Sequence, residues 1–161
     1  MPAGNEVTSV IVAGLGGQGV LKASDILAEV AFRSGLDVKK SEIHGMSQRG
    51  GSVTSDVRFG ALVHSPMVPA GEAHYLVVAA ADQVENNLCQ LRPGGILIEP
   101  GQIDDRRLPN KRALNVALLG RLSRYLDFPD SLWRDAIRSH LAQNLHEANL
   151  RAFELGRASL D

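Results

Sequence analysis

The chain lacks the features that mark several classes of protein. Its one cysteine, Cys89, is too few for an iron–sulfur cluster or a structural zinc site and does not suggest an oxidising compartment. Its 17 Lys and Arg residues are balanced by 18 Asp and Glu residues, so we expect neither nucleic acid nor a membrane surface as partner. The longest apolar run, 75–81, is far shorter than the roughly 20 residues of a membrane span. With no signal-peptide pattern at the start, we expect a cytoplasmic protein.

Glycine is the informative excess. The 161 residues are 44% apolar, which fits a single globular domain over 1–161. Of the 16 glycines, nine fall between positions 14 and 60. Because glycine adopts backbone conformations that other residues avoid and lets other groups approach closely, we expect a functional site in the first third of the chain.

The first part of the chain predicts a strand, a helix and a strand. The β-branched run over 7–13 predicts a buried parallel strand that ends at a glycine cluster. Apolar residues at helical spacing predict a helix over 19–33, and a second strand follows over 37–43, completing a βαβ unit. Alternation at 53, 57 and 59 predicts a strand with a solvated face or at a sheet edge, where Asp56 and Arg58 are candidates for an interface.

The rest of the chain predicts further strands and then helices. We expect an irregular connection over 60–73, buried strands over 75–80 and 96–98, and a helix from Asp82 that buries Cys89. The charged stretch 102–112 predicts a mobile linker, and three amphipathic helices follow it, one capped by Asp130. The fold class is α/β, with a three-layer, Rossmann-like, mostly parallel sheet and a helical C-terminal third; the strand order cannot be derived. The runs 7–13 and 75–80 are expected to be adjacent or near-adjacent core strands.

The first candidate site is a glycine fingerprint between the first strand and helix. The residues Gly14, Gly16, Gly17, Gln18 and Gly19 fit the pattern G-x-G-x-x-G, in which glycines let phosphates approach the backbone and the helix N-terminus. Glu42, 23 residues after Gly19, is a candidate ribose-binding acid. The alternative is a tight turn without a ligand. The lysine of a phosphate-binding P-loop is missing, since Val20 and Leu21 follow Gly19.

The second candidate site is the polar loop 44–51. It contributes His44, Ser47, Gln48 and Arg49 and ends in two glycines. Because it follows the second strand, we expect it beside the first glycine turn at the carboxyl edge of the sheet. Two such loops with one arginine suit an anionic ligand, and a contact with a partner subunit explains them almost equally well.

No other residues predict a catalytic or metal site. His140 and His146 lack metal-ligand spacing, and His64 and His74 are isolated, as expected for surface or strand-edge residues. Asn115 and Asn149 lie on apolar helical stripes, where we expect them to satisfy buried backbone groups.

The motifs over 12–20 and 41–53 together resemble the gamma subunit or domain of 2-oxoacid:ferredoxin oxidoreductases. The stretch 39–60 is most similar to the small (beta) subunit of indolepyruvate ferredoxin oxidoreductase, and Ser65-Pro66, Leu91 to Gly95 and the helical end extend the resemblance over nearly the whole chain. The resemblance implies an enzyme complex that converts a 2-oxoacid and coenzyme A into acyl-CoA, CO2 and reduced ferredoxin.

In that family thiamine diphosphate and the iron–sulfur clusters belong to other subunits or domains. The resemblance therefore implies an accessory subunit, inactive alone, that meets the large thiamine-binding subunit or the diphosphate end of coenzyme A; we expect no cofactor bound by this chain alone. Pairing of two copies of this chain in a homodimer is a further alternative. Two alternatives remain: a free-standing NAD- or FAD-binding Rossmann domain, and a non-enzymatic scaffold module.

Overall fold

A five-stranded sheet with helices on both faces forms the centre of the molecule. The computed structural model describes residues 6–45 and 50–160. The strands are β1 (Thr8–Leu15), β2 (Asp37–His44), β3 (Ser52–Gly60), β4 (Ala73–Val78) and β5 (Leu91–Ile98), in the order β2-β3-β1-β4-β5. The helices are α1 (Val20–Arg33), α2 (Val84–Asn87), α3 (Leu114–Ser123), α4 (Asp130–His140) and α5 (His146–Arg157).

The strand directions confirm the α/β class and show a mixed sheet that is parallel in part. β4 runs parallel to both β1 and β5, whereas β3 is antiparallel to its neighbours β1 and β2, so four of the five strands point the same way. β1 and β4 are adjacent and almost wholly buried, as expected for the two most apolar runs. No described helix is long and apolar enough to cross a bilayer.

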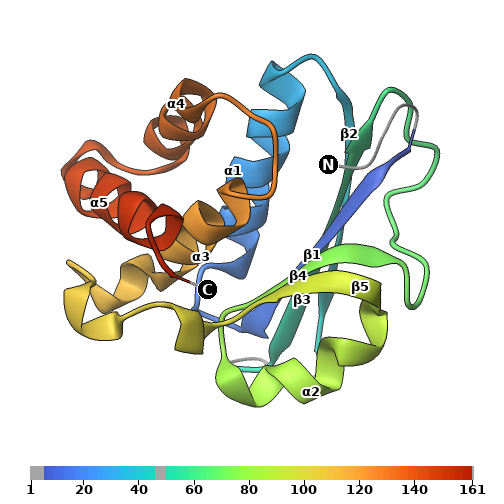
Figure 1. The fold of residues 1–161 in the computed structure, drawn as a ribbon, viewed down its shortest axis with the longest axis horizontal. Coiled ribbons are helices and arrows are strands. Elements are labelled where there is room, and N and C mark those ends of the chain that lie inside the picture. Colours follow the sequence, from blue (N-terminus) through green and yellow to red (C-terminus); the bar gives the residue numbers. More distant parts are fainter. Residues whose placement is uncertain (1–5, 46–49, 161) are drawn as a thin grey trace.

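The two faces of the sheet are covered unequally. Figure 1 shows α1, α3, α4 and α5 gathered on one face, where they bury the larger core. Trp133 and Phe153 stack in this core with ring centroids 5.7 Å apart. The other face carries a smaller cluster, including Ile11, Leu76 and Val78, under α2 and the connection 61–72. The layer formed by α2 and this connection is therefore thinner than the helical layer on the opposite face.

Two sequence interpretations of the sheet were wrong. β3 is an internal strand rather than an edge, and Asp56 on it is buried, with its carboxylate accepting the Val68 N–H at 2.9 Å. Arg58 on the same strand donates to carbonyls of the connection, so these two residues hold a loop and do not form an edge interface.

Several local predictions also need correction. The helix expected from Asp82 breaks into a one-turn α2 flanked by 3-10 turns, Asp82 caps nothing, and Cys89 is exposed. The stretch 102–112 folds into 3-10 turns anchored by the buried Ile103 and is no plain linker. Asp130 is the first helical residue rather than the N-cap. β5 starts at Leu91, and of its residues only Ile98 is fully buried.

Candidate functional site

The glycine turn between β1 and α1 is closed by its own side chain and backbone. The Gln18 amide oxygen accepts the Leu15 N–H at 2.7 Å, and the Gln18 N–H donates to the Leu15 carbonyl at 3.1 Å. Gly17 and Gly19 have φ values of +90° and +75°, which side chains other than glycine rarely adopt. The Gln18 amide oxygen therefore shapes the turn.

The remaining glycines of the fingerprint allow close packing within the protein. A Cβ at Gly14 would come within 2.9 Å of the Val20 side chain. The Gly16 N–H donates to the Gly51 carbonyl at 2.8 Å, so it is used to join the two glycine-rich loops. Among the four glycines of the fingerprint, Gly17 alone faces open space, since an added Cβ there would have no atom within 4 Å. The exposed part of the turn is thus centred on Gly17.

The first turn of α1 has backbone N–H groups without a partner inside the helix. The first intrahelical hydrogen bond runs from Ala23 to the Gly19 carbonyl, and no described side chain caps the helix. Asn115 at the start of α3 donates its side-chain N–H to the same Gly19 carbonyl at 3.1 Å. Asn115 therefore satisfies a backbone group, as expected from its place on an apolar helix. Asn149 does the same for the Leu145 carbonyl at 2.9 Å.

The loop 44–51 lies where the topology predicts. β2 and β1 run in the same direction, and the Gly16–Gly51 hydrogen bond places the end of the loop against the glycine turn. His44, at the end of β2, lines a hollow of about 260 Å³ with Gly16, Gly17 and Val20. Ser47, Gln48 and Arg49 lie outside the described residues.

A second hollow, of about 390 Å³, also opens at the turn. It is lined by Gly17, Gln18, Gly19, Ala79, Lys111, Arg112 and Leu114. Its two cations come from the 3-10 turn that leads into α3, and their side chains are exposed and form no ion pair with any described residue. Lys22 in the first turn of α1 lines the first hollow with His44 and forms no ion pair with the part of the chain that the structure describes. Among residues 6–45 and 50–160, no carboxylate lines either hollow, so the described surroundings of Gly17 are positively charged.

Sequence reasoning missed Lys111 and Arg112. They fall in the stretch 102–112, which we interpreted as a linker because its charged residues are typical of a solvent-exposed segment. A usable signal was their position: they follow the last parallel strand, whose carboxyl end lies at the same edge as the glycine turn.

The topology disfavours a dinucleotide at the fingerprint. In a dinucleotide-binding unit the acid that ends the second strand lies on the neighbour of β1. Here β3 separates β2 from β1, and Glu42 points to Lys40 at 3.1 Å on the edge strand. Glu42 is therefore displaced by one strand from the position that contacts a ribose.

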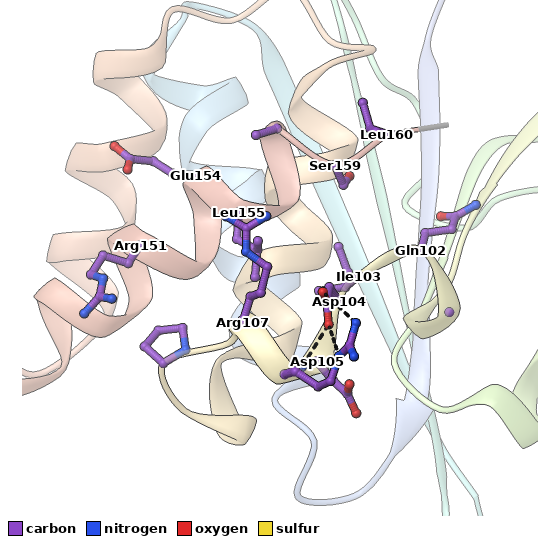
Figure 2. Close-up of a pocket in the computed structure, with 14 residues that line it drawn as sticks. Gln102, Ile103, Asp104, Asp105, Arg107, Arg151, Glu154, Leu155, Ser159 and Leu160 are labelled. Carbon is purple, nitrogen blue, oxygen red and sulfur yellow. Dashed lines mark hydrogen bonds and ion pairs between the residues drawn. The ribbon is translucent and has the colours of Figure 1, made fainter.

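Other candidates contain none of the predicted site residues. A hollow of about 840 Å³ between 101–109 and the end of α5 has mixed charge, with Arg106 bound to Asp104 at 3.1 Å (Figure 2). His74 is buried rather than at the surface, its ring bridging the Ser9 N–H and Glu6 at 3.0 Å each. The described residues contain no group of three potential metal ligands.

Comparisons with known proteins agree on one family. Residues 9–109 match the model of the family described as pyruvate ferredoxin/flavodoxin oxidoreductase. Indolepyruvate oxidoreductase subunit IorB of Thermococcus kodakarensis is 31% identical, over 92% of this chain and 93% of that protein. The same subunit of Methanothermobacter thermautotrophicus is 49% identical over 65 residues, which are 40% of this chain and 33% of that protein.

Solved structures share the fold. The gamma subunit of keto/oxoacid ferredoxin oxidoreductase from Geobacter sulfurreducens superposes with a TM-score of 0.78 at 20% identity, covering 92% of this chain and 95% of that one. A 2-oxoglutarate:ferredoxin oxidoreductase from Magnetococcus marinus, with 2-oxoglutarate, coenzyme A and succinyl-CoA bound, gives 0.83 at 18% identity. This chain covers 31% of it, and 96% of this chain is aligned.

Proposed function

The chain belongs to the pyruvate ferredoxin/flavodoxin oxidoreductase family and is a subunit of a 2-oxoacid:ferredoxin oxidoreductase, and we propose that its glycine turn forms part of the coenzyme A site of that complex. The complex then converts a 2-oxoacid and coenzyme A to acyl-CoA and CO2 and passes the electrons to ferredoxin. The curated relatives favour indolepyruvate or another arylpyruvate as the 2-oxoacid.

The positively charged surroundings of Gly17 carry this proposal. Coenzyme A has a diphosphate and a further phosphate, and phosphates bind well to helix N-termini, glycine-rich backbone and unpaired Lys or Arg. Gly17, the start of α1, Lys111 and Arg112 offer all three around one hollow. The described residues therefore fit a phosphate group there.

The predicted residues divide between binding and support. Gly17, Gly19, His44, Ser47, Gln48 and Arg49 remain our candidates for contact with coenzyme A or the large subunit. Gly14 and Gln18 support that surface from within, because a Cβ at Gly14 would meet Val20 and the Gln18 side chain closes the turn. Gly16 is exposed, and its N–H joins the two loops.

The decarboxylation and the electron transfer take place on a partner chain. One cysteine cannot ligate an iron–sulfur cluster. The family resemblance implies that thiamine diphosphate and the clusters belong to a large catalytic subunit. In this division of labour the present chain holds and orients coenzyme A at the entrance, in a cytoplasmic complex, and donates no group to the reacting atoms.

Replacing Arg49 with Ala in the assembled complex tests the proposal. Loss of a charge-assisted contact worth roughly 1.5–3 kcal/mol predicts a ten- to hundredfold loss in affinity. We expect the KM for coenzyme A to rise by that factor while kcat changes little, and Lys111→Ala to act in the same direction. If subunit affinity falls instead, the loop contacts the large subunit.

Arg107→Ala is the matched control. Arg107 is exposed and forms no ion pair with a described residue, but it lines the hollow of Figure 2 and not the glycine turn. Its replacement should leave the KM for coenzyme A unchanged. Wild-type KM and subunit affinity in Arg49→Ala and Lys111→Ala would show that both loops are structural.

A further inference from the structure

The two edges of the sheet differ in how well they are protected against pairing. β5 carries Pro93 and a left-handed Gly94, and its register with β4 is irregular between Ala73 and Tyr75. β2 has neither proline nor bulge and pairs with β3 without interruption over eight residues. A long regular edge strand offers unpaired N–H and C=O groups to another strand. β2 is protected by charged side chains instead, and because these carry both signs (Lys39, Lys40 and Glu42), it suits a partner that opposes them with the opposite charge.

The backbone groups that β2 turns outward can be identified. The Gly45 N–H donates to the Ser52 carbonyl at 2.6 Å, so this opposed pair is hydrogen-bonded. Because bonded and non-bonded pairs alternate in an antiparallel ladder, odd-numbered residues of β2 bond to β3. The even-numbered residues, from Val38 to His44, direct their N–H and C=O groups away from the sheet.

We propose that β2 pairs antiparallel with β2 of a second copy of this chain, with Ser41 on the two-fold axis. A two-fold axis that joins two such edges stands perpendicular to the sheet, so a residue opposes one of the same parity. With Ser41 at the centre, Lys40 opposes Glu42 of the second copy, and Glu42 opposes its Lys40. Val38 opposes His44, and seven residues of each strand are paired.

Charge selects this register from the alternatives. Centring the pair on Lys40 opposes two lysines, and centring it on Glu42 opposes two carboxylates; like charges opposed across a ladder are unfavourable. A centre at Lys39 also opposes two lysines, and a centre at Ile43 shortens the overlap. In the monomer Lys40 contacts Asp25 and Glu42, so its ammonium already lies on the face where the second copy's Glu42 arrives.

A cysteine scan reads the register directly. Ser41→Cys in a Cys89→Ser background places two thiols in a non-hydrogen-bonded pair, with Cα atoms about 4.5 Å apart, within the range for a disulfide. Under mild oxidation we expect the full-length chain to form a covalent dimer. Lys39→Cys and Ile43→Cys in the same background are the controls and should cross-link at least tenfold more slowly.

Charge variants test the pairing without a covalent bond. Lys40→Glu opposes two pairs of carboxylates and Glu42→Lys two pairs of lysines, so each variant alone should dimerise at least tenfold more weakly than wild type. An equimolar mixture restores opposite charges in both pairs and should dimerise as wild type does. Light scattering after size-exclusion chromatography measures all three.

Each other outcome overturns the proposal. It fails if the wild-type chain is monomeric at about 100 μM, if the three cysteine variants cross-link at equal rates, or if the mixture stays monomeric. Cross-linking of Ser41→Cys to a different subunit in the assembled complex would assign the edge to that partner. None of these experiments measures coenzyme A kinetics, so their result is independent of the proposed function.

Discussion

Asp37 and Asp56 each accept a backbone N–H from the connection between β3 and β4, at Val63 (2.8 Å) and Val68 (2.9 Å). Their environments differ. Burial raises the pKa of Asp56, although the Val68 N–H and Arg58 oppose the shift. The Val63 N–H, with Lys39 nearby, lowers the pKa of Asp37. Two carboxylates in similar structural roles thus respond to pH in opposite directions.

Asp56→Asn is expected to stabilise the protein at neutral pH. A carboxyl with a raised pKa favours folding most below its unfolded pKa of about 3.8, and this contribution is lost as pH rises through the folded value. The amide oxygen still accepts the Val68 N–H but never ionises. In urea titrations from pH 4 to 7, the variant should gain free energy of unfolding relative to wild type as pH rises. A difference in free energy of unfolding between variant and wild type that stays constant or narrows as pH rises contradicts this.

Asp37→Asn is expected to show the opposite sign. A lowered pKa contributes stability above about 3.8 that is lost as pH falls through the folded value. The variant should therefore be less stable than wild type at pH 7, and the difference should shrink on acidification. Because this carboxylate is solvent-accessible, we expect a small effect. Equal destabilisation at pH 7 and pH 3 would mean that the hydrogen bond, and not the charge, carries the effect.

At the scale of elements, α3 and α5 approach so closely that glycine is required at the contact. A Cβ at Gly156 would overlap the Ala117 carbonyl, and one at Gly120 would overlap the Phe153 carbonyl. Gly156→Ala would gain about 1 kcal/mol of helix propensity at an unhindered site. Here we expect the overlap to dominate and the free energy of unfolding to fall by about 1–3 kcal/mol, or roughly 3–10 °C in Tm.

Gly101→Ala is the control for this contact. An added Cβ there comes no closer than 3.9 Å to any atom, and the residue is exposed. Differential scanning calorimetry should give an unchanged Tm for this variant. A Gly156→Ala protein as stable as Gly101→Ala would show that the two helices can separate without loss.

The elements could be predicted where local pattern decides them, and not where tertiary contacts do. The buried strands β1 and β4 and the helices after residue 113 follow from apolar spacing alone. β3 resembled an edge because Asp56 and Arg58 alternate with apolar residues, but their polar groups meet the connection 61–68 instead of solvent. The insertion of β3 between β1 and β2 leaves no trace in local sequence.

The candidate site was predictable in part for the same reason. The meeting of the glycine turn with the end of loop 44–51 follows from strand direction, and the Gly16–Gly51 hydrogen bond confirms it. The internal use of Gln18 and the arrival of Lys111 and Arg112 depend on how α3 packs against the turn. Contacts between segments about 100 residues apart carry no periodic signal.

At the scale of the whole molecule, the chain has two cations, Lys111 and Arg112, in the hollow beside Gly17 and a single cysteine. We therefore expect the isolated chain to show no 2-oxoacid-dependent reduction of a viologen dye, even with coenzyme A and thiamine diphosphate added. Since its proposed part is to hold coenzyme A, the large subunit alone should show a much higher KM for coenzyme A, and adding this chain should lower that KM. Dye reduction by the pure chain would contradict this division of labour. Full activity of the large subunit alone, at an unchanged KM, would instead remove coenzyme A from this chain's role.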